Sequence, residues 1–211
     1  GGYKAFEPVI FQAWGRDGFD ATWRRIRVVF VSLLLVAAVA VGLLGREFLQ
    51  ILTTARFHEA YRVVPVVALA ACLRGFGLLF SILLVAAKRT TIAAVVVLAG
   101  AAVNVGMNLV LIPRLGILGA AWSSVAAYGL MAPLAYVACE RLGILRVRDL
   151  LVRDLLALAA GIALVGAVVY GQGGAPSWGL FGLKVLLILV YGAGVAVLYR
   201  VWSYLRDAST D

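Results

Sequence analysis

Long apolar runs without a charged residue divide this chain. Four of them contain no Asp, Glu, Lys or Arg: Val28–Gly45, Thr90–Pro113, Leu115–Cys139 and Leu155–Leu183. A helix needs about 20 apolar residues to cross a hydrocarbon core of about 30 Å. Four such runs within 211 residues indicate membrane-spanning helices rather than the core of a soluble domain.

The pattern predicts six spans. The segment Val63–Ala87 is apolar apart from one arginine, and the last uncharged run is broken by the turn-forming stretch Gly171–Ser177, which favours a hairpin of two helices. The predicted spans are Val28–Leu44, Val63–Ala87, Thr91–Ile112, Gly116–Cys139, Leu155–Tyr170 and Gly179–Trp202. The expected fold class is therefore all-α, a polytopic transmembrane helix bundle.

The composition supports this assignment. Of the 211 residues, 64% are hydrophobic and 14% are charged, whereas about a quarter of a soluble domain is charged. The formal net charge is +9, but the Lys and Arg residues lie between the apolar runs and form no dense tract. Membrane proteins collect such residues in cytoplasmic loops, so we expect no nucleic-acid partner.

The basic residues are divided unequally between the two sides that six spans define. One side holds thirteen: Lys4, Arg16, Arg24, Arg25, Arg27, Lys88, Arg89, Arg141, Arg146, Arg148, Arg153, Arg200 and Arg206. The other side holds five: Arg46, Arg56, Arg62, Arg114 and Lys184. Because cytoplasmic loops carry the excess, we predict that both termini lie in the cytoplasm.

Two polar segments are predicted to lie on the membrane surface. Arg46–Arg62 is amphipathic with charges of both signs and is expected on the outer side. Arg141–Asp154 is basic with interleaved leucines and is expected on the cytoplasmic leaflet. A solvated loop is the alternative for each.

Arg74 is the most informative polar residue within a predicted span. It lies eleven residues into Val63–Ala87, roughly 16 Å along a helix. No Asp or Glu is expected within any span, so no carboxylate at similar depth is predicted for it. A cation at that depth normally faces a cavity, a partner or the bundle interior. Two interpretations follow: Arg74 bonds backbone carbonyls and hydroxyls, or it lines a water-filled path and attracts an anionic substrate.

Asn104 and Asn108 are four residues apart and therefore lie on one face of their predicted helix. Gly100 extends this face, and small residues with amides are typical of helix contacts in lipid. Packing is the first interpretation of the pair, and contact of Asn104 with Arg74 is the second. In the next span, Gly119 and Ser123 predict a close helix approach.

No catalytic or metal-binding constellation is found, so we expect neither an enzyme, nor a cofactor, nor a metal site. Cys72 and Cys139 lie in apolar stretches and are interpreted as small buried hydrophobic residues.

The order of several short motifs resembles a known family. Tyr61–Pro65 opens the second predicted span, Asn104 and Asn108 follow in the third, and Ile112–Ala121 joins the third to the fourth. The pattern N-x-x-x-N followed by I-P-x-x-G-I-x-G-A-A resembles the C-terminal half of polysaccharide-biosynthesis flippases, within the multidrug/oligosaccharidyl-lipid/polysaccharide exporter superfamily. Tyr3–Pro8 resembles the end of the preceding helix in that family. The resemblance extends from about Tyr3 to Arg141.

The resemblance implies two helical lobes around a central cavity, in a bacterial cytoplasmic membrane. It implies that a lipid-linked sugar is the substrate, moved across the cytoplasmic membrane for the cell envelope by alternating access, with membrane lipids and an N-terminal lobe as partners. Arg74, Asn104 and Asn108 would be substrate-binding residues: the cation would neutralise a diphosphate or acidic sugar, and the amides would bond sugar hydroxyls. A drug or small-molecule exporter of the same superfamily is one alternative. A non-catalytic scaffold or subunit is another.

Four regions follow from spans and resemblance together. Residues 1–27 are expected to be the cytoplasmic end of a preceding span and a loop, and 28–139 a four-helix core. Residues 140–154 are the cytoplasmic interfacial segment, and 155–211 are the last two transmembrane helices and a cytoplasmic tail.

The topology can be tested by labelling single cysteines in a background that lacks Cys72 and Cys139. We expect a Ser177→Cys variant to react with a membrane-impermeant thiol reagent in intact cells, because the Gly171–Ser177 hairpin is predicted on the outer side. Labelling only after permeabilisation would contradict the predicted orientation.

Overall fold

A computed structural model of the chain describes residues 7–144, 148–171 and 180–200. Within these residues every regular element is a helix, and six of the helices are long and apolar enough to cross a membrane. The predicted fold class, an all-α polytopic bundle, is confirmed. The chain is a multi-pass membrane protein.

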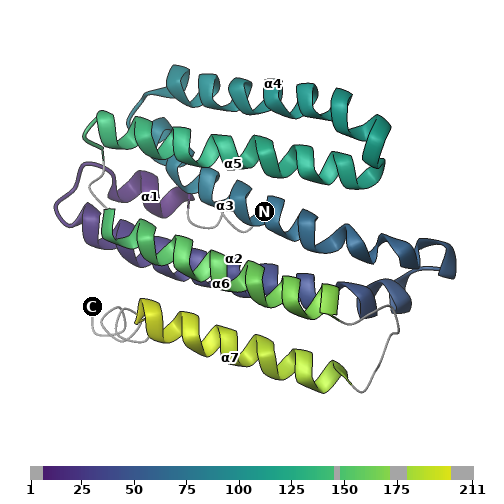
Figure 1. Ribbon diagram of the computed structural model, residues 1–211. Coiled ribbons are helices and arrows are strands. Elements are labelled where there is room, and N and C mark those ends of the chain that lie inside the picture. Colours follow the sequence, from purple (N-terminus) through teal and green to yellow (C-terminus); the bar gives the residue numbers. More distant parts are fainter. Residues whose placement is uncertain (1–6, 145–147, 172–179, 201–211) are drawn as a thin grey trace. The chain divides into compact units, whose positions relative to one another are not determined.

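Figure 1 shows the helices, labelled in chain order. They are α1 Glu7–Ala13, α2 Phe19–Leu52, the 3₁₀ segment η2 Ala55–Arg62, α3 Val64–Ala86, α4 Thr90–Leu115, α5 Ile117–Arg141, α6 Arg148–Gly171 and α7 Phe181–Tyr199. Each predicted span corresponds to one helix. The predicted hairpin lies, beyond Gly171, outside the described residues.

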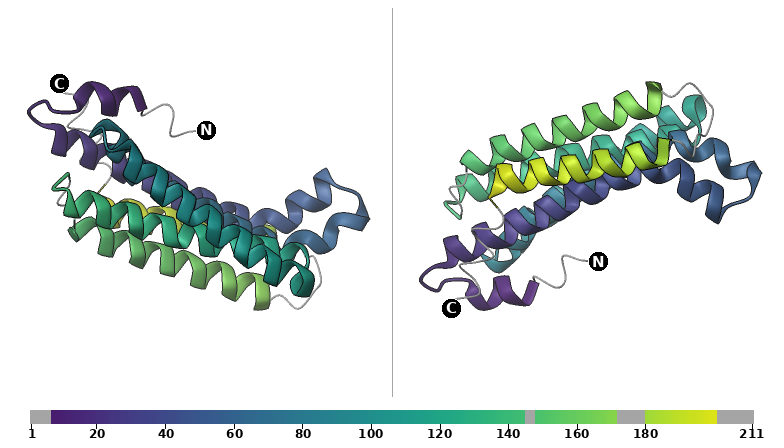
Figure 2. Two further views of the ribbon diagram at one scale, coloured as in Figure 1. Left: turned by 90° about the horizontal axis from the view of Figure 1, so that it is seen from above. Right: turned by 90° about the horizontal axis from the view of Figure 1, so that it is seen from below.

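Helix α2 is much longer than its predicted span. It contains 34 residues, about 51 Å of helix, and runs as one continuous rod in both views of Figure 2. It takes in Arg24, Arg25 and Arg27 at one end and Glu47 at the other. The surface segment predicted from Arg46 to Arg62 therefore divides into about the last two turns of α2 and the 3₁₀ segment η2. Helix α6 likewise begins at Arg148, within the segment predicted to lie on the cytoplasmic leaflet.

Backbone contacts divide the chain into two compact units, and the first contains α4, α5, most of α3 and the start of α2. Helices α4 and α5 lie side by side (Figure 1), joined at Gly116, whose φ of 57° is readily adopted by glycine. Gly119 lies directly against the Leu111 backbone, as predicted for a close approach, and Ser123 Oγ donates a hydrogen bond to Gly119 O. Helices α3 and α5 meet where the Phe80 ring packs edge-on against Tyr136 at 5.4 Å.

The second unit contains the rest of α2 with α6 and α7. Small residues bring these helices together: Gly42 faces Val165, Gly161 faces Tyr191 and Val39, and Gly192 faces Val36. Without a hydrophobic driving force between helices in lipid, such close packing is a main source of association.

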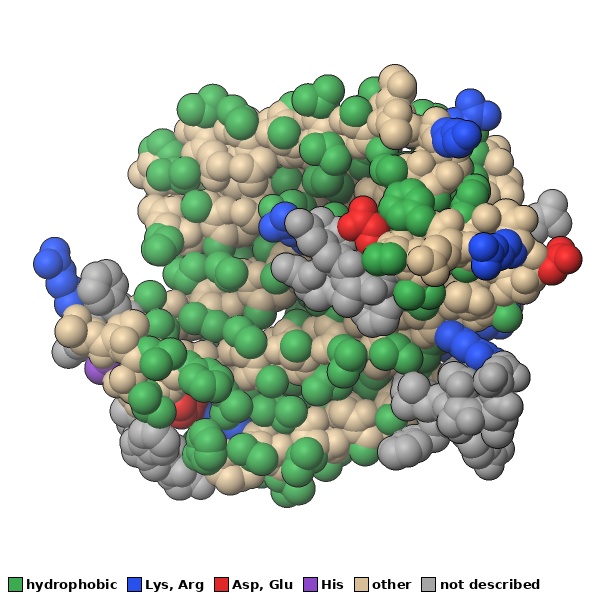
Figure 3. All heavy atoms as spheres, turned by 180° about the vertical axis from the view of Figure 1, so that it is seen from behind, with side chains coloured by type: hydrophobic (Ala, Val, Ile, Leu, Met, Phe, Trp, Pro, Cys, Tyr) green, Lys and Arg blue, Asp and Glu red, His purple; other side chains and the backbone are tan. Residues whose placement is uncertain are grey.

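Large apolar side chains cover much of the surface, as Figure 3 shows for one face. Leu109 on α4 is 74% exposed and Val197 on α7 is 78% exposed. Surfaces of this kind are expected where helices face lipid. The two cysteines, in contrast, are buried and not in a disulfide, as predicted.

The contact at the start of α5 predicts a difference between two glycines. Gly119→Ala should destabilise the protein by about 1–3 kcal/mol, because the added Cβ meets the Leu111 backbone, which cannot move aside like a side chain. Gly106→Ala is the matched control and should be neutral or stabilising, because a Cβ added at this helical glycine would meet nothing within 4 Å. Unfolding in detergent measures both, and equal stabilities would contradict the packing described.

Candidate functional site

Arg74 lies halfway along α3 and its side chain is exposed. Its guanidinium carbon lies 5.8 Å from the centroid of the Tyr128 ring on α5. One residue before it, Leu73 contacts Gly129, so the two helices approach closely at this level. Tyr128 is a member of this site that sequence reasoning missed. Only the packing of α3 against α5 reveals it.

Asn104 and Asn108 share a face of α4, as predicted. Asn108 Nδ2 donates a hydrogen bond of 3.0 Å to Asn104 Oδ1, and both residues are half-buried. Among the described residues, neither amide is hydrogen-bonded to Arg74. The structure therefore joins the two asparagines to each other, and it places Arg74 with Tyr128 instead.

Helix contacts fix the relative levels of these groups in the first unit. Gly100 on α4 faces Met131 and Ala127 on α5, and Leu73 on α3 faces Gly129 on the same helix. Arg74 therefore lies beside the same part of α5 as Gly100 does. Asn104 is about one helical turn from Gly100 along α4. Within the first unit, Arg74 and Asn104 are therefore at similar positions along the helices, about one turn apart.

Beyond the predicted span Val28–Leu44, α2 carries a buried acidic residue that the sequence analysis did not single out. Glu47 lies on α2 and is 6% exposed, and Lys184 on α7 is 3% exposed. Lys184 Nζ donates a hydrogen bond of 2.5 Å to Glu47 Oε1. The pair crosses from α2 to α7 within the second unit. In a low-dielectric interior, either charge without the other would strongly destabilise the folded protein.

Glu47 was missed because a charged residue was taken as the end of an apolar span. Buried positions on α2 recur at every fourth residue: Val31, Leu35, Val39, Leu43 and Glu47. Positions four apart form a continuous row that turns about 40° around the helix at each step. Glu47 therefore continues a buried stripe, and this spacing is the signal that could have revealed it.

Arg27 extends the same stripe in the other direction and is 1% exposed. The sequence placed it in a cytoplasmic loop before the first span, but α2 has already begun at Phe19. Its guanidinium carbon lies 5.7 Å from the Phe80 ring centroid within the first unit. Arg27 therefore belongs to the interior of that unit.

A second buried acid, Asp154, lies on α6. Tyr199 at the end of α7 donates a hydrogen bond of 2.5 Å from its hydroxyl to Asp154 Oδ1. Tyr191, further along α7, donates one of 2.8 Å to the backbone oxygen of Ala157. Helix α7 is thus bonded to α6 through Tyr191 and Tyr199, and to α2 through Lys184.

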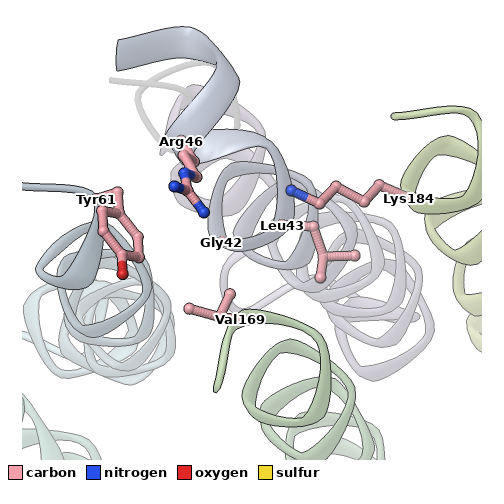
Figure 4. Close-up of a pocket in the computed structure, with 6 residues that line it drawn as sticks. All are labelled: Gly42, Leu43, Arg46, Tyr61, Val169 and Lys184. Carbon is pink, nitrogen blue, oxygen red and sulfur yellow. The ribbon is translucent and has the colours of Figure 1, made fainter. Parts of the chain in front are cut away.

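A small pocket lies beside the ion pair in the second unit. It is lined by Gly42, Leu43, Arg46, Tyr61, Val169 and Lys184 (Figure 4). The Arg46 guanidinium carbon lies 4.8 Å from the Tyr61 ring centroid. The pocket is small, close to the lower limit for one water molecule.

No group of His, Cys, Asp and Glu that could hold a metal ion is found in residues 7–144, 148–171 and 180–200. No family model, curated protein or solved structure matches this chain. The family resemblance inferred from the sequence therefore stays a prediction.

The buried pair makes a prediction about stability. Glu47→Gln should lower the free energy of unfolding by about 3 kcal/mol or more, because it leaves the Lys184 ammonium buried without a carboxylate. The double variant Glu47→Leu/Lys184→Met should recover most of the loss, since it removes both charges. Glu140→Gln, at an exposed acid, is the control. Denaturant titration in mixed micelles measures all three, and a Glu47→Gln variant as stable as wild type would contradict a buried, paired carboxylate.

Proposed function

We propose that this chain is part of a flippase that moves lipid-linked oligosaccharides or polysaccharide precursors across the membrane by alternating access. The observation that carries the proposal is the exposed guanidinium of Arg74, halfway along an apolar helix. The six apolar helices and the sequence resemblance support it.

A cation at this position is costly if it faces lipid. Charged side chains within spans therefore face the bundle interior or a water-filled cavity. In the part of the chain that the structure describes, the partner of Arg74 is the Tyr128 ring, which is uncharged and leaves the guanidinium's donors available. An anionic ligand would supply the missing negative charge.

The diphosphate of a lipid-linked sugar fits the donors of Arg74. A guanidinium presents a planar fork that binds two phosphate oxygens at once, and the interaction strengthens where water is excluded. The ring of Tyr128 restrains the guanidinium from one side, which reduces the conformational entropy lost on binding.

The asparagines fit the sugar part of such a substrate. Asn104 accepts a hydrogen bond from Asn108 and keeps its own Nδ2 group as a donor. An amide held in this way loses little further conformational entropy when it forms a hydrogen bond with a sugar hydroxyl. In this proposal Arg74 binds phosphate, and Asn104 and Asn108 lie about one and two helical turns away along α4, toward the sugar.

Export by Arg74 variants of the full-length protein tests the proposal. Arg74→Ala should reduce export per folded molecule by at least about tenfold, because the charge that binds phosphate is lost. Arg74→Lys should keep part of the activity, since it retains the charge but not the fork. Arg114→Ala, at an exposed arginine near the end of α4, is the control and should export normally.

The alternative is that Arg74 only joins α3 to α5 through Tyr128. Arg74→Ala would then lower the amount of folded protein and leave export per folded molecule unchanged. Normalising transport to folded protein, measured by size-exclusion chromatography with fluorescence detection, separates the two outcomes. Wild-type transport per molecule would refute the role of Arg74 in substrate binding.

A further inference from the structure

Tyr128 carries a hydroxyl group that the fold leaves unused. Its ring lies beside Arg74, with 5.8 Å between the ring centroid and the guanidinium carbon. In the described part of the chain, no hydrogen bond joins the Tyr128 hydroxyl to another group. The hydroxyls of Ser123 and Ser124, one turn earlier on α5, both donate hydrogen bonds to backbone oxygens of their own helix. The Tyr128 hydroxyl is therefore a donor that remains available beside the cation.

This hydroxyl belongs to a residue in the middle of a membrane-spanning helix. Tyr128 is eleven residues after the start of α5 at Ile117 and thirteen before its end at Arg141, which corresponds to roughly 16 Å and 20 Å of helix. A hydroxyl without a hydrogen bond is costly where water is scarce. Two polar groups from different helices, the Tyr128 hydroxyl and the Arg74 guanidinium, thus lie deep in the first unit, and neither is hydrogen-bonded to a described residue.

The two donors together distinguish between kinds of anion. The planar fork of a guanidinium binds two oxygens of a carboxylate or of a phosphate. A carboxylate has no further oxygen, whereas a phosphate is tetrahedral and has others, outside the plane of the fork. A hydroxyl placed to one side of the guanidinium can therefore donate to a phosphate that the fork already holds, but it finds no free oxygen on a carboxylate held in the same way.

We propose that the Tyr128 hydroxyl donates a hydrogen bond to the phosphate group that Arg74 binds, and that this bond makes the site prefer phosphate to carboxylate. This role of Tyr128 rests on the proposed function, since it takes Arg74 as the residue that binds the anion. The hydroxyl is carried by the ring beside which the guanidinium lies, so one phosphate contacts both α3 and α5. Arg74 supplies the charge, and Tyr128 determines the class of anion.

Binding of two amphiphiles to the full-length protein in a non-ionic detergent tests this role. Dodecyl phosphate and dodecanoate have alkyl chains of equal length, and isothermal titration calorimetry measures each at a pH at which both are ionised. We expect the wild type to bind dodecyl phosphate at least about tenfold more tightly, because a hydrogen bond to a charged group is added. Tyr128→Phe keeps the ring beside Arg74 and removes only the hydroxyl. Its affinity for dodecyl phosphate should fall by about tenfold or more, and its affinity for dodecanoate should not change.

Tyr136→Phe is the matched control. Tyr136 lies eight residues further along α5, and its ring packs edge-on against Phe80 at 5.4 Å. Its hydroxyl also has no hydrogen bond to a described residue, but Arg74 lies beside the ring of Tyr128 instead. The Tyr136→Phe variant should therefore bind both amphiphiles like the wild type. An equal loss of phosphate binding in the two phenylalanine variants would overturn the specific role of Tyr128.

The binding of Arg74→Ala separates this role from the proposed function. If Arg74→Ala loses both amphiphiles and Tyr128→Phe binds them like the wild type, the role of the hydroxyl is overturned and that of Arg74 stands. If Arg74→Ala binds dodecyl phosphate like the wild type, or if the wild type does not bind it, both are overturned. A Tyr128→Phe variant that does not fold would show that the hydroxyl has a structural partner, and it would also overturn the proposal.

Discussion

The structure depends on one constraint: polar groups inside a bilayer have no water molecules with which to form hydrogen bonds. The described part of the chain meets it first by being helical, since each helix satisfies its own backbone. Serine hydroxyls then donate hydrogen bonds to backbone oxygens one turn earlier in the same helix, as Ser123 does to Gly119 O and Ser124 does to Ala120 O. Tyr191 uses its hydroxyl between helices, on the backbone oxygen of Ala157. The ion pair of Glu47 and Lys184 is the strongest case, because full charges are involved.

Two cations on apolar helices meet this constraint in opposite ways. Lys184 is buried, and Glu47 neutralises it. Arg74 is exposed, and an aromatic ring lies beside it. A cation–ring contact contributes far less than the desolvation of a guanidinium costs. In the proposal above, this imbalance leaves Arg74 available to a ligand, whereas Lys184 joins two helices.

The fold could be predicted from the sequence because length and apolarity determine where a helix crosses a membrane. All six long helices in the described residues correspond to predicted spans, and the turn at Gly116 falls where the fourth span was expected to begin. The ends of α2 could not be placed in the same way, because Arg27 and the charged residues that begin at Arg46 were interpreted as boundaries. Arg27 and Glu47 are buried, and a buried charge cannot be distinguished from a span boundary without knowing its partner.

The site was predictable only as far as it lies on one helix. The contact of Asn104 with Asn108 follows from a spacing of four residues, and the structure confirms it. Tyr128 and Lys184 contact their partners across long sequence separations, and Lys184 is 137 residues from Glu47. No local pattern encodes such contacts. They arise because small residues such as Gly42 and Gly129 let particular faces meet. Where Leu73 meets Gly129, α3 and α5 are near enough for Arg74 to reach the Tyr128 ring. The charge of the cation comes from one residue, but its position depends on the packing of two helices.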